Sequence, residues 1–366
     1  MSKISDFSNI QESTKIGEVV PVVPLNASKF ISDGYLKCDG GIVSQDHYPS
    51  LYNKIGLIRD TNFDNWTTRT SETTSVIYTL TYGNNTYAYA GAGGVLKTST
   101  DVINWTTRTS GTTSIIYALT YGNNIFLYGG AGGVLKTSTD AISWTTRTSG
   151  EVQIIRSIVY ENGIYLFGGD GGVTGTSTNG ENWVTTVSGI TGSITDLTYG
   201  NGLYNFISWT GSVQYLGTST NATNWTISTL FINYALYSLV YGNNTFIYSD
   251  NIGAFHTSTD AINWTTRTSG TTSAIYSLYY DNNNIFIYSG AGGVLGTSTD
   301  AINWTTRTSG TTSVIYSLTY GNGLFVYGGA GGVLKTCDKY TYNESSEFLL
   351  PEQIDNENFD LYIRAE

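Results

Sequence analysis

The sequence predicts an all-β protein: a seven-bladed β-propeller of four-stranded blades, inserted in a small split α+β domain. Seven tryptophans recur at intervals of 39, 39, 39, 42, 39 and 40 residues. Each interval holds short segments rich in β-branched and aromatic residues, separated by Gly, Asn, Ser and Asp. A Tyr-x-Asn turn, most often Tyr-Gly-Asn, also occurs seven times. A period near 40 with four short strands is typical of a propeller blade, and no segment shows the helical spacing of a helical repeat.

The second copy of the repeat illustrates the four expected strands. They are expected at residues 114–121, 125–128, 134–137 and 144–148. Gly122-Asn123-Asn124 is a hairpin-type turn between the first two strands. The glycine-rich segment 129–133 separates the second strand from the third, and Ser138-Thr139-Asp140 ends the third. No proline interrupts residues 61–336, as expected where strands pair on both sides.

The two ends of the repeat region predict how the ring closes. The last copy ends at Thr336 without its tryptophan strand, whereas residues 65–69 supply a spare strand at the start. We therefore expect the N-terminal strand to complete the seventh blade and remove its free edge. Closure would bring the flanks together, so residues 1–60 and 337–366 are predicted to form one split domain around a propeller of residues 61–336.

Composition excludes several classes of function. The net charge is −11, and no basic stripe is present, so we expect no nucleic-acid partner. No apolar run approaches the ~20 residues that span a bilayer, and the start has no signal-peptide pattern, so we expect cytoplasmic synthesis without membrane insertion. Cys38 and Cys337 match no zinc spacing. We expect neither a metal nor a cofactor.

The Ser-Thr-Asp-x-x-Asn-Trp turns resemble the Asp-box of sialidases and related propellers, which lies between the third and fourth strands of a blade. In those families the Asp binds backbone donors of its own turn, and the Trp packs between blades. The resemblance implies a structural role for Asp101, Trp105, Asp140, Trp144, Asp260, Trp264, Asp300 and Trp304.

The flanks carry a second set of motifs. They are Gly34-Tyr35-Leu36-Lys37-Cys38-Asp39-Gly40, Tyr48-Pro49-Ser50-Leu51-Tyr52, Ile55-Gly56, Phe348-Leu349-Leu350-Pro351-Glu352 and Tyr362-Ile363-Arg364-Ala365. Their order resembles the tail-collar family of phage fibre proteins, although Glu352 replaces the usual Asp and the propeller replaces a short loop. The segment 48–56 would be a short helix. The resemblance implies a virion protein that contacts other virion proteins through residues 1–60 and 337–366, in several copies.

The residue types argue against catalysis. Sialidases clamp a carboxylate with three arginines, and Arg156 is the one arginine expected on an inner strand. A glycosidase needs two carboxylates, and Asp170 and Asp250 are expected in the loops between second and third strands of blades three and five. His47 and His256 have no neighbouring nucleophile. We expect no catalytic residue, and a glycan-degrading enzyme stays an alternative.

The fourth copy departs most from the repeat. It is longer by three residues, between Tyr199 and Trp225, than the second copy. The extra residues lie beside Trp209, a tryptophan outside the repeat register. An aromatic side chain on a loop beside amides is typical of carbohydrate faces and interface anchors. The predicted ligand-binding residues are Trp209, Gln214, Tyr215, Asp170, Asp250 and Arg156.

These observations predict a phage virion protein, associated with a tail fibre or collar, whose propeller binds a glycan or protein of the host surface. A purely structural decoration or connector protein of the virion is the main alternative.

Overall fold

The structure is a computed structural model of the chain. It describes residues 63–230, 234–281 and 285–338, and, outside these ranges, the backbone of strands β1 to β4 and β33 to β35. The chain divides into two compact units, one of Phe63–Cys337 and one of Met1–Asn62 with Asp338–Glu366. These bounds lie within two residues of those expected from composition. The helix expected over 48–56 lies outside the described residues.

The smaller unit is built by both ends of the chain. Its described strands are β1 (Val19–Val22), β2 (Tyr35–Lys37), β3 (Ile42–Ser44), β4 (Arg59–Asp60), β33 (Thr341–Tyr342), β34 (Glu347–Leu349) and β35 (Asp360–Arg364). β35 pairs with β1 on one side and β2 on the other, β34 pairs with β3, and β33 pairs with β4, all antiparallel. Every one of these pairs joins the N-terminal segment to the C-terminal segment.

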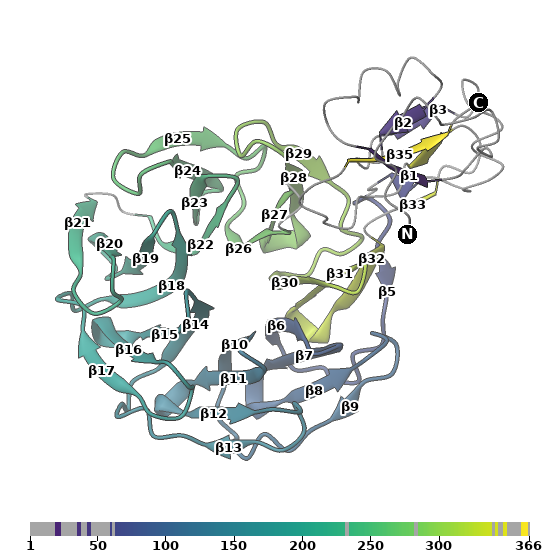
Figure 1. Ribbon diagram of the computed structural model, residues 1–366. Coiled ribbons are helices and arrows are strands. Elements are labelled where there is room, and N and C mark those ends of the chain that lie inside the picture. Colours follow the sequence, from purple (N-terminus) through teal and green to yellow (C-terminus); the bar gives the residue numbers. More distant parts are fainter. Residues whose placement is uncertain are drawn as a thin grey trace. The chain divides into compact units, whose positions relative to one another are not determined.

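The larger unit is a seven-bladed β-propeller of four-stranded antiparallel blades, which confirms the predicted fold (Figure 1). From the channel outward, the first blade consists of β6 (Ile77–Gly83), β7 (Thr86–Gly91), β8 (Leu96–Ser99) and β9 (Thr106–Thr107), and the second of β10 (Ile116–Gly122), β11 (Ile125–Gly130), β12 (Leu135–Ser138) and β13 (Thr145–Thr146). The third blade consists of β14 (Ile155–Glu161), β15 (Ile164–Gly169), β16 (Val173–Ser177) and β17 (Val184–Val187), and the fourth of β18 (Ser193–Gly200), β19 (Leu203–Trp209), β20 (Gln214–Ser219) and β21 (Thr226–Leu230).

The fifth blade consists of β22 (Leu236–Gly242), β23 (Thr245–Asp250), β24 (Ala254–Ser258) and β25 (Thr265–Thr268). The sixth consists of β26 (Ile275–Tyr280), β27 (Phe286–Gly290), β28 (Leu295–Ser298) and β29 (Thr305–Arg307). The seventh consists of β30 (Ile315–Gly321), β31 (Leu324–Gly329), β32 (Leu334–Asp338) and β5 (Thr67–Thr68). Five blades carry a short 3-10 turn between the second and third strands: η3 (Ala92–Gly94), η4 (Ala131–Gly133), η5 (Asp170–Gly172), η6 (Ala291–Gly293) and η7 (Ala330–Gly332). In the described ranges no helix is long and apolar enough to cross a membrane.

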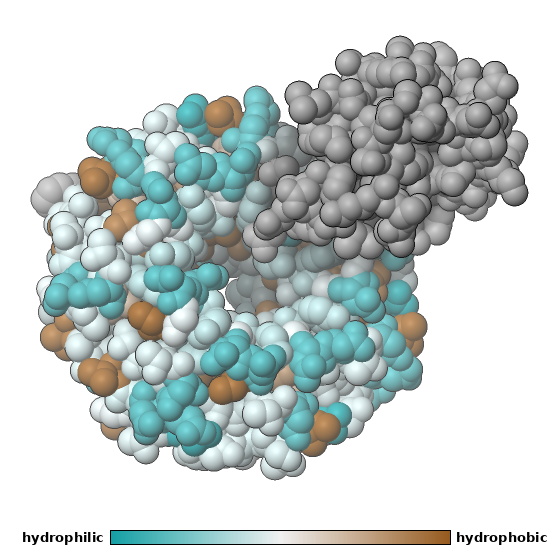
Figure 2. All heavy atoms as spheres, in the orientation of Figure 1, coloured by the Kyte–Doolittle hydropathy of each residue, from teal (hydrophilic) through white to brown (hydrophobic). Residues whose placement is uncertain are grey.

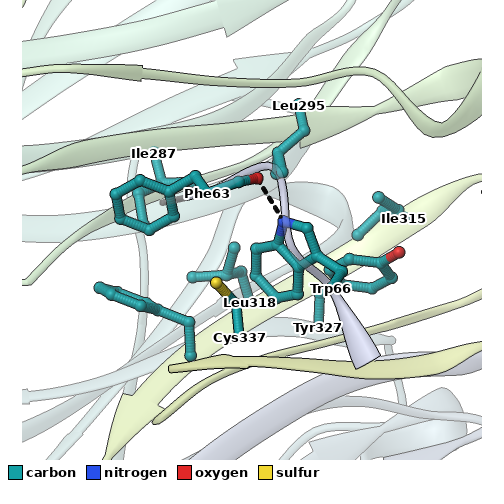
Figure 3. Close-up of a cluster of buried hydrophobic side chains, with 9 residues drawn as sticks. Phe63, Trp66, Ile287, Leu295, Ile315, Leu318, Tyr327 and Cys337 are labelled. Carbon is teal, nitrogen blue, oxygen red and sulfur yellow. Dashed lines mark hydrogen bonds between the residues drawn. The ribbon is translucent and has the colours of Figure 1, made fainter. Parts of the chain in front are cut away.

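The N-terminal strand closes the ring, as the spare tryptophan strand predicts. β5 pairs antiparallel with β32, on the outer side of the seventh blade. Figure 3 shows Trp66, just before β5, inside a buried cluster with Tyr327, their ring centroids 4.6 Å apart. The Trp66 indole N–H donates to the carbonyl of Phe63 at 2.7 Å. The N-terminal segment is therefore held in the seventh blade by apolar contacts and main-chain pairing.

The second strand is longer than the sequence suggests. In the second blade it was expected to end at Tyr128, but β11 continues to Gly130 because Gly129 and Gly130 pair with β10 across a β-bulge. A side chain on Gly130 would place its Cβ 2.1 Å from the Ile115 carbonyl oxygen. Two glycines that read as a turn are therefore strand residues that allow close backbone approach.

The apolar core lies between neighbouring blades. Tyr89 packs on Trp105 in the first blade, with ring centroids 4.7 Å apart. The same buried cluster contains Val326 and Leu334 of the seventh blade. Because each blade buries its face against the next, the hydrophobic gain is complete only when the ring closes.

Candidate binding site at the mouth of the central channel

The Asp-box-like turns use their carboxylates locally. Asp101 accepts the backbone N–H groups of Ile103 and Asn104 at 2.9 and 2.8 Å. The Trp105 indole donates to the Val102 carbonyl at 3.1 Å, and Val102 has a φ of 56°. Equivalent bonds surround Asp140 with Trp144, Asp260 with Trp264, and Asp300 with Trp304. Each turn is thus held by its own side chains.

These turns predict an acid-dependent loss of stability. In Asp101, Asp260 and Asp300 the carboxyl pKa lies well below its usual range, chiefly because the backbone N–H three residues further on donates to it. A lowered folded-state pKa means that the stabilisation is complete above the unfolded-state value of about 4 and is lost as the pH falls below it. As the pH falls from about 5 to 2, the urea concentration at the midpoint of unfolding should therefore decrease less in a chain with Asn at all three of these positions than in the unchanged chain.

Asn179 and Asn221 supply the control for this prediction, because they already occupy the equivalent position in blades three and four. Each accepts the same two backbone N–H groups. The Asn variants should accordingly keep the fold at neutral pH. A decline with falling pH as steep as that of the unchanged chain would contradict the assigned role of the carboxylates.

A ring of side chains, one from each inner strand, surrounds the mouth of the channel. Each lies at the β-bulge near the start of its strand, where the register with the second strand shifts. Bulges of this kind turn a side chain away from the regular alternation. We call these residues the mouth ring: Tyr78, Tyr117, Arg156, Thr195, Tyr237, Tyr276 and Tyr316.

The five tyrosines form one continuous arc. Tyr78 touches Tyr117 and Tyr316, with ring centroids 5.4 and 5.2 Å apart. Tyr276 continues the arc to Tyr237 at 4.7 Å and contacts Tyr316 at 5.3 Å. Burial raises the pKa of Tyr78, Tyr237 and Tyr316, so their hydroxyl groups stay protonated. These three hydroxyl groups are therefore uncharged, and each can both donate and accept a hydrogen bond.

Blades three and four interrupt the arc. Arg156 lies over the Tyr117 ring at 5.7 Å, and it binds both carboxylate oxygens of Asp170, with Nη2 to Oδ2 at 3.1 Å. Thr195 occupies the next position, where a small side chain leaves a gap. Trp209 flanks this gap and is 44% exposed. The mouth ring, Ser193 and Trp209 enclose a cavity of about 300 Å³.

The space-filling view shows one face of the propeller. On the face in Figure 2, hydrophobic residues form separate spots among polar residues around the opening of the ring. No single broad hydrophobic patch covers this face of the described residues. Within the described part of the chain, this face therefore has no large apolar surface through which a partner could bind.

A second layer lies deeper in the channel, in a cavity of about 260 Å³. Hydroxyl groups in this layer accept the backbone N–H of the next blade, as Ser238 does from Leu278 at 3.0 Å. Asp196 stands at this position in the fourth blade and accepts from Ser157, Ser238, Leu197 and Leu239. Burial nevertheless raises the pKa of Asp196, and none of the ion pairs of the described residues includes it.

Asp196→Ser, which restores the repeat residue, is expected to stabilise the protein at neutral pH by about 1 kcal/mol. A raised folded-state pKa means that ionisation disfavours the fold, so the gain should be present at pH 7 and vanish below about pH 4. The serine can still accept from Leu239, as Ser238 accepts from Leu278. Urea unfolding at both pH values measures the effect. A variant less stable than the parent at pH 7 would contradict this account.

The other predicted ligand-binding residues lie elsewhere. Asp250 is the last residue of β23 rather than a loop residue, is 1% exposed, and accepts from the backbone of Ile252 and Ala254. Its other oxygen faces His256 at 3.4 Å. Gln214 is fully buried opposite Trp209 in the β19–β20 hairpin. The loop expected there is short, because both strands extend.

Tyr215 is half-buried against the apolar cluster of the fourth blade. Of the six residues predicted to bind ligand, the structure brings three to the mouth: Arg156 and Trp209 line the cavity, and Asp170 is held to Arg156. Sequence reasoning missed the five tyrosines and Thr195. Aligning the starts of the seven inner strands, five of which have tyrosine at the second position, would also have exposed Thr195.

Known proteins resemble this chain in fold. No family model matches the chain, and no curated protein matches its sequence. Among solved structures, YCF48 bound to D1 peptide is similar at a TM-score of 0.63 and 18% identity, over 77% of this chain and 97% of that one. The likeness shows the fold alone.

Two further structures lead to the same conclusion. The WD40 β-propeller domain of Doa1 is similar at a TM-score of 0.63 and 13% identity, over 79% of this chain and 99% of the domain. Virginiamycin B lyase from Staphylococcus aureus is similar at a TM-score of 0.66 and 12% identity, over 75% and 98%. Propellers at these identities differ in function, so function has to be argued from the site.

Proposed function

We propose that this chain is a phage virion protein, associated with the tail or a tail fibre, that presents its propeller for recognition of the host surface. The side chains at the mouth of the channel support a role in recognition of the host surface. Five blades supply tyrosine there, whereas two adjacent blades supply a paired arginine and a threonine beside an exposed tryptophan. A concave site with aromatic walls and a few convergent polar groups is typical of ligand binding.

The virion assignment rests on the tail-collar-like motifs at the two ends of the chain. Two of these motifs pair with each other, since Tyr35–Lys37 of β2 lies antiparallel to residues 362–364 of β35. Residues 1–60 and 337–366 would attach the protein to other virion proteins. Several copies on one particle would combine weak contacts into strong adsorption.

The proposed activity is non-covalent. A glycosidase requires two carboxylates on either side of the scissile bond. Asp170 is engaged by Arg156, and Asp250 is buried with backbone and histidine partners. The two acids also occupy different positions of the repeat, since Asp170 aligns with Trp209 and Asp250 with Gly169. We therefore assign neither of them a role in hydrolysis.

Electron microscopy and adsorption assays test this function together. Gold-labelled antibodies against the chain should mark the tail or fibres of intact virions. Purified fluorescent chain should adsorb to host cells and, in excess, slow adsorption of the phage. Absence of label from every virion structure, or an unchanged adsorption rate, would contradict the proposal.

A further inference from the structure

Four departures from the repeat lie together at the mouth of the channel. Two aligned positions of each blade lie at this end of the channel: the mouth-ring residue, and the residue that ends the second strand or directly follows it. In blades one, two, six and seven this pair is Tyr with Ala: Tyr78 and Ala92, Tyr117 and Ala131, Tyr276 and Ala291, Tyr316 and Ala330. Blade three has Arg156 with Asp170, blade four has Thr195 with Trp209, and blade five keeps Tyr237 but has Asn251 at the second position. Both members of the pair change in these two adjacent blades.

The changes create an asymmetric recess. The tyrosine arc ends at Tyr117 on one side and at Tyr237 on the other, and Arg156 and Thr195 fill the interval. Threonine removes the aromatic ring that the repeat would place there. Trp209 stands beside this gap with 44% of its surface exposed. A ligand can therefore meet an indole and tyrosine rings around one opening.

The recess carries no net charge. Arg156 and Asp170 neutralise each other in a two-point ion pair. Among the described residues that line this cavity, Arg156 is the one charged side chain, and Asp196 lines the deeper cavity instead. The pair still offers hydrogen bonds, because Arg156 keeps its Nη1 donors and each Asp170 oxygen can accept again. These properties favour a neutral, hydroxyl-rich ligand over an anion or a cation.

Sugars match this chemistry. The C–H face of a pyranose stacks on an indole or phenol ring, and its neighbouring hydroxyl groups bind a donor and an acceptor side by side. The cavity of about 300 Å³ is at the lower end of the ~300–1,000 Å³ typical of small-ligand sites, which suits one or two sugar rings. We propose that the mouth binds the end of a neutral glycan, with Trp209 as the stacking platform and the Arg156–Asp170 pair as its hydrogen-bonding partner.

The test uses the full chain on an array of neutral hexose- and N-acetylhexosamine-terminated oligosaccharides, with sialylated, uronate-containing and phosphorylated glycans and a set of peptides. Binding to neutral oligosaccharides is expected. Calorimetric titration with the strongest neutral oligosaccharide should show a loss of tenfold or more in Trp209→Ala and in Thr195→Tyr. The second variant closes the gap with the repeat residue, so its fold should persist, as thermal unfolding would show.

Ile302→Ala is the matched control, since Ile302 is 48% exposed on a turn between the third and fourth strands, at the other end of its blade. It should bind as the parent does. Binding only to charged glycans, binding only to peptides, or full affinity in both mouth variants would each overturn the inference.

This inference rests on the proposed function, but the two can fail separately. If the fluorescent chain adsorbs to host cells equally with and without Trp209, recognition stands and the assigned site is wrong. If neutral oligosaccharides require Trp209 but the chain adsorbs to no host cell, the site stands and the proposed biological role is wrong.

Discussion

Replacing Gly332 by alanine is expected to destabilise the propeller by about 4 kcal/mol or more, whereas the same change at Gly331 should cost only about 1–2 kcal/mol. Both residues have left-handed backbones, with φ values of 73° and 67°. A Cβ on Gly332 would lie 1.9 Å from the Thr73 carbonyl oxygen, but a Cβ on Gly331 would have nothing within 4 Å. The first change must therefore separate the backbone of η7 from the loop that enters the first blade.

The adjacent glycine controls for backbone strain, so the difference between the two variants isolates the contact between blades. The same contact recurs at Gly293, where a Cβ would lie 2.0 Å from the Thr311 carbonyl oxygen. Gly293→Ala should thus resemble Gly332→Ala. Equal urea midpoints for the Gly331 and Gly332 variants would show that the two backbones are not in close contact.

Trp66→Ala is expected to cost about 3–5 kcal/mol and to release the strand that closes the ring. Trp66 is 9% exposed and packs on Tyr327. β5 is only two residues long, so its attachment to β32 depends on this packing. In Trp66→Ala, backbone amides of β32 and β5 should exchange with deuterium much faster than in the parent.

Trp105→Ala is the control for lost packing, because Trp105 makes the same contact with Tyr89 inside a blade whose strands are continuous in sequence. It should lower the free energy of unfolding by a similar amount without faster exchange in β32. If the backbone amides of β32 exchanged with deuterium at the same rate in both variants, the N-terminal strand would not be what closes the ring.

The architecture could be predicted from the sequence because its signals are local and repeated. The recurring Tyr-x-Asn turns gave the number of blades. The absence of a tryptophan strand after Thr336, with a spare one around Trp66, gave the closure. Strand ends were predicted less accurately, because Gly129 and Gly130 have the sequence of turn residues although they pair across a bulge.

The site could be predicted only in part, because it depends on contacts that cross the ring. The sequence identified Trp209 as the tryptophan outside the repeat register and Arg156 as the one arginine on an inner strand. The pairing of Arg156 with Asp170, 14 residues later in the chain, depends on the bulge that places Arg156 at the mouth. The tyrosines could not be predicted as site residues because they are regular residues of the repeat. They form a site only when the inner strands of the seven blades come together around the channel. Gln214 was misplaced because the extended hairpin buries it.

Recognition of the host surface is expected to depend on the four departures from the repeat at the mouth. A chain with all four residues returned to the repeat should fold normally and lose adsorption to host cells: Arg156→Tyr, Asp170→Ala, Thr195→Tyr and Trp209→Ala. The control restores Asn179→Asp and Asn221→Asp in the same two blades, in the turns between third and fourth strands, and should adsorb fully. A folded four-residue variant that adsorbs as well as this control would contradict the account.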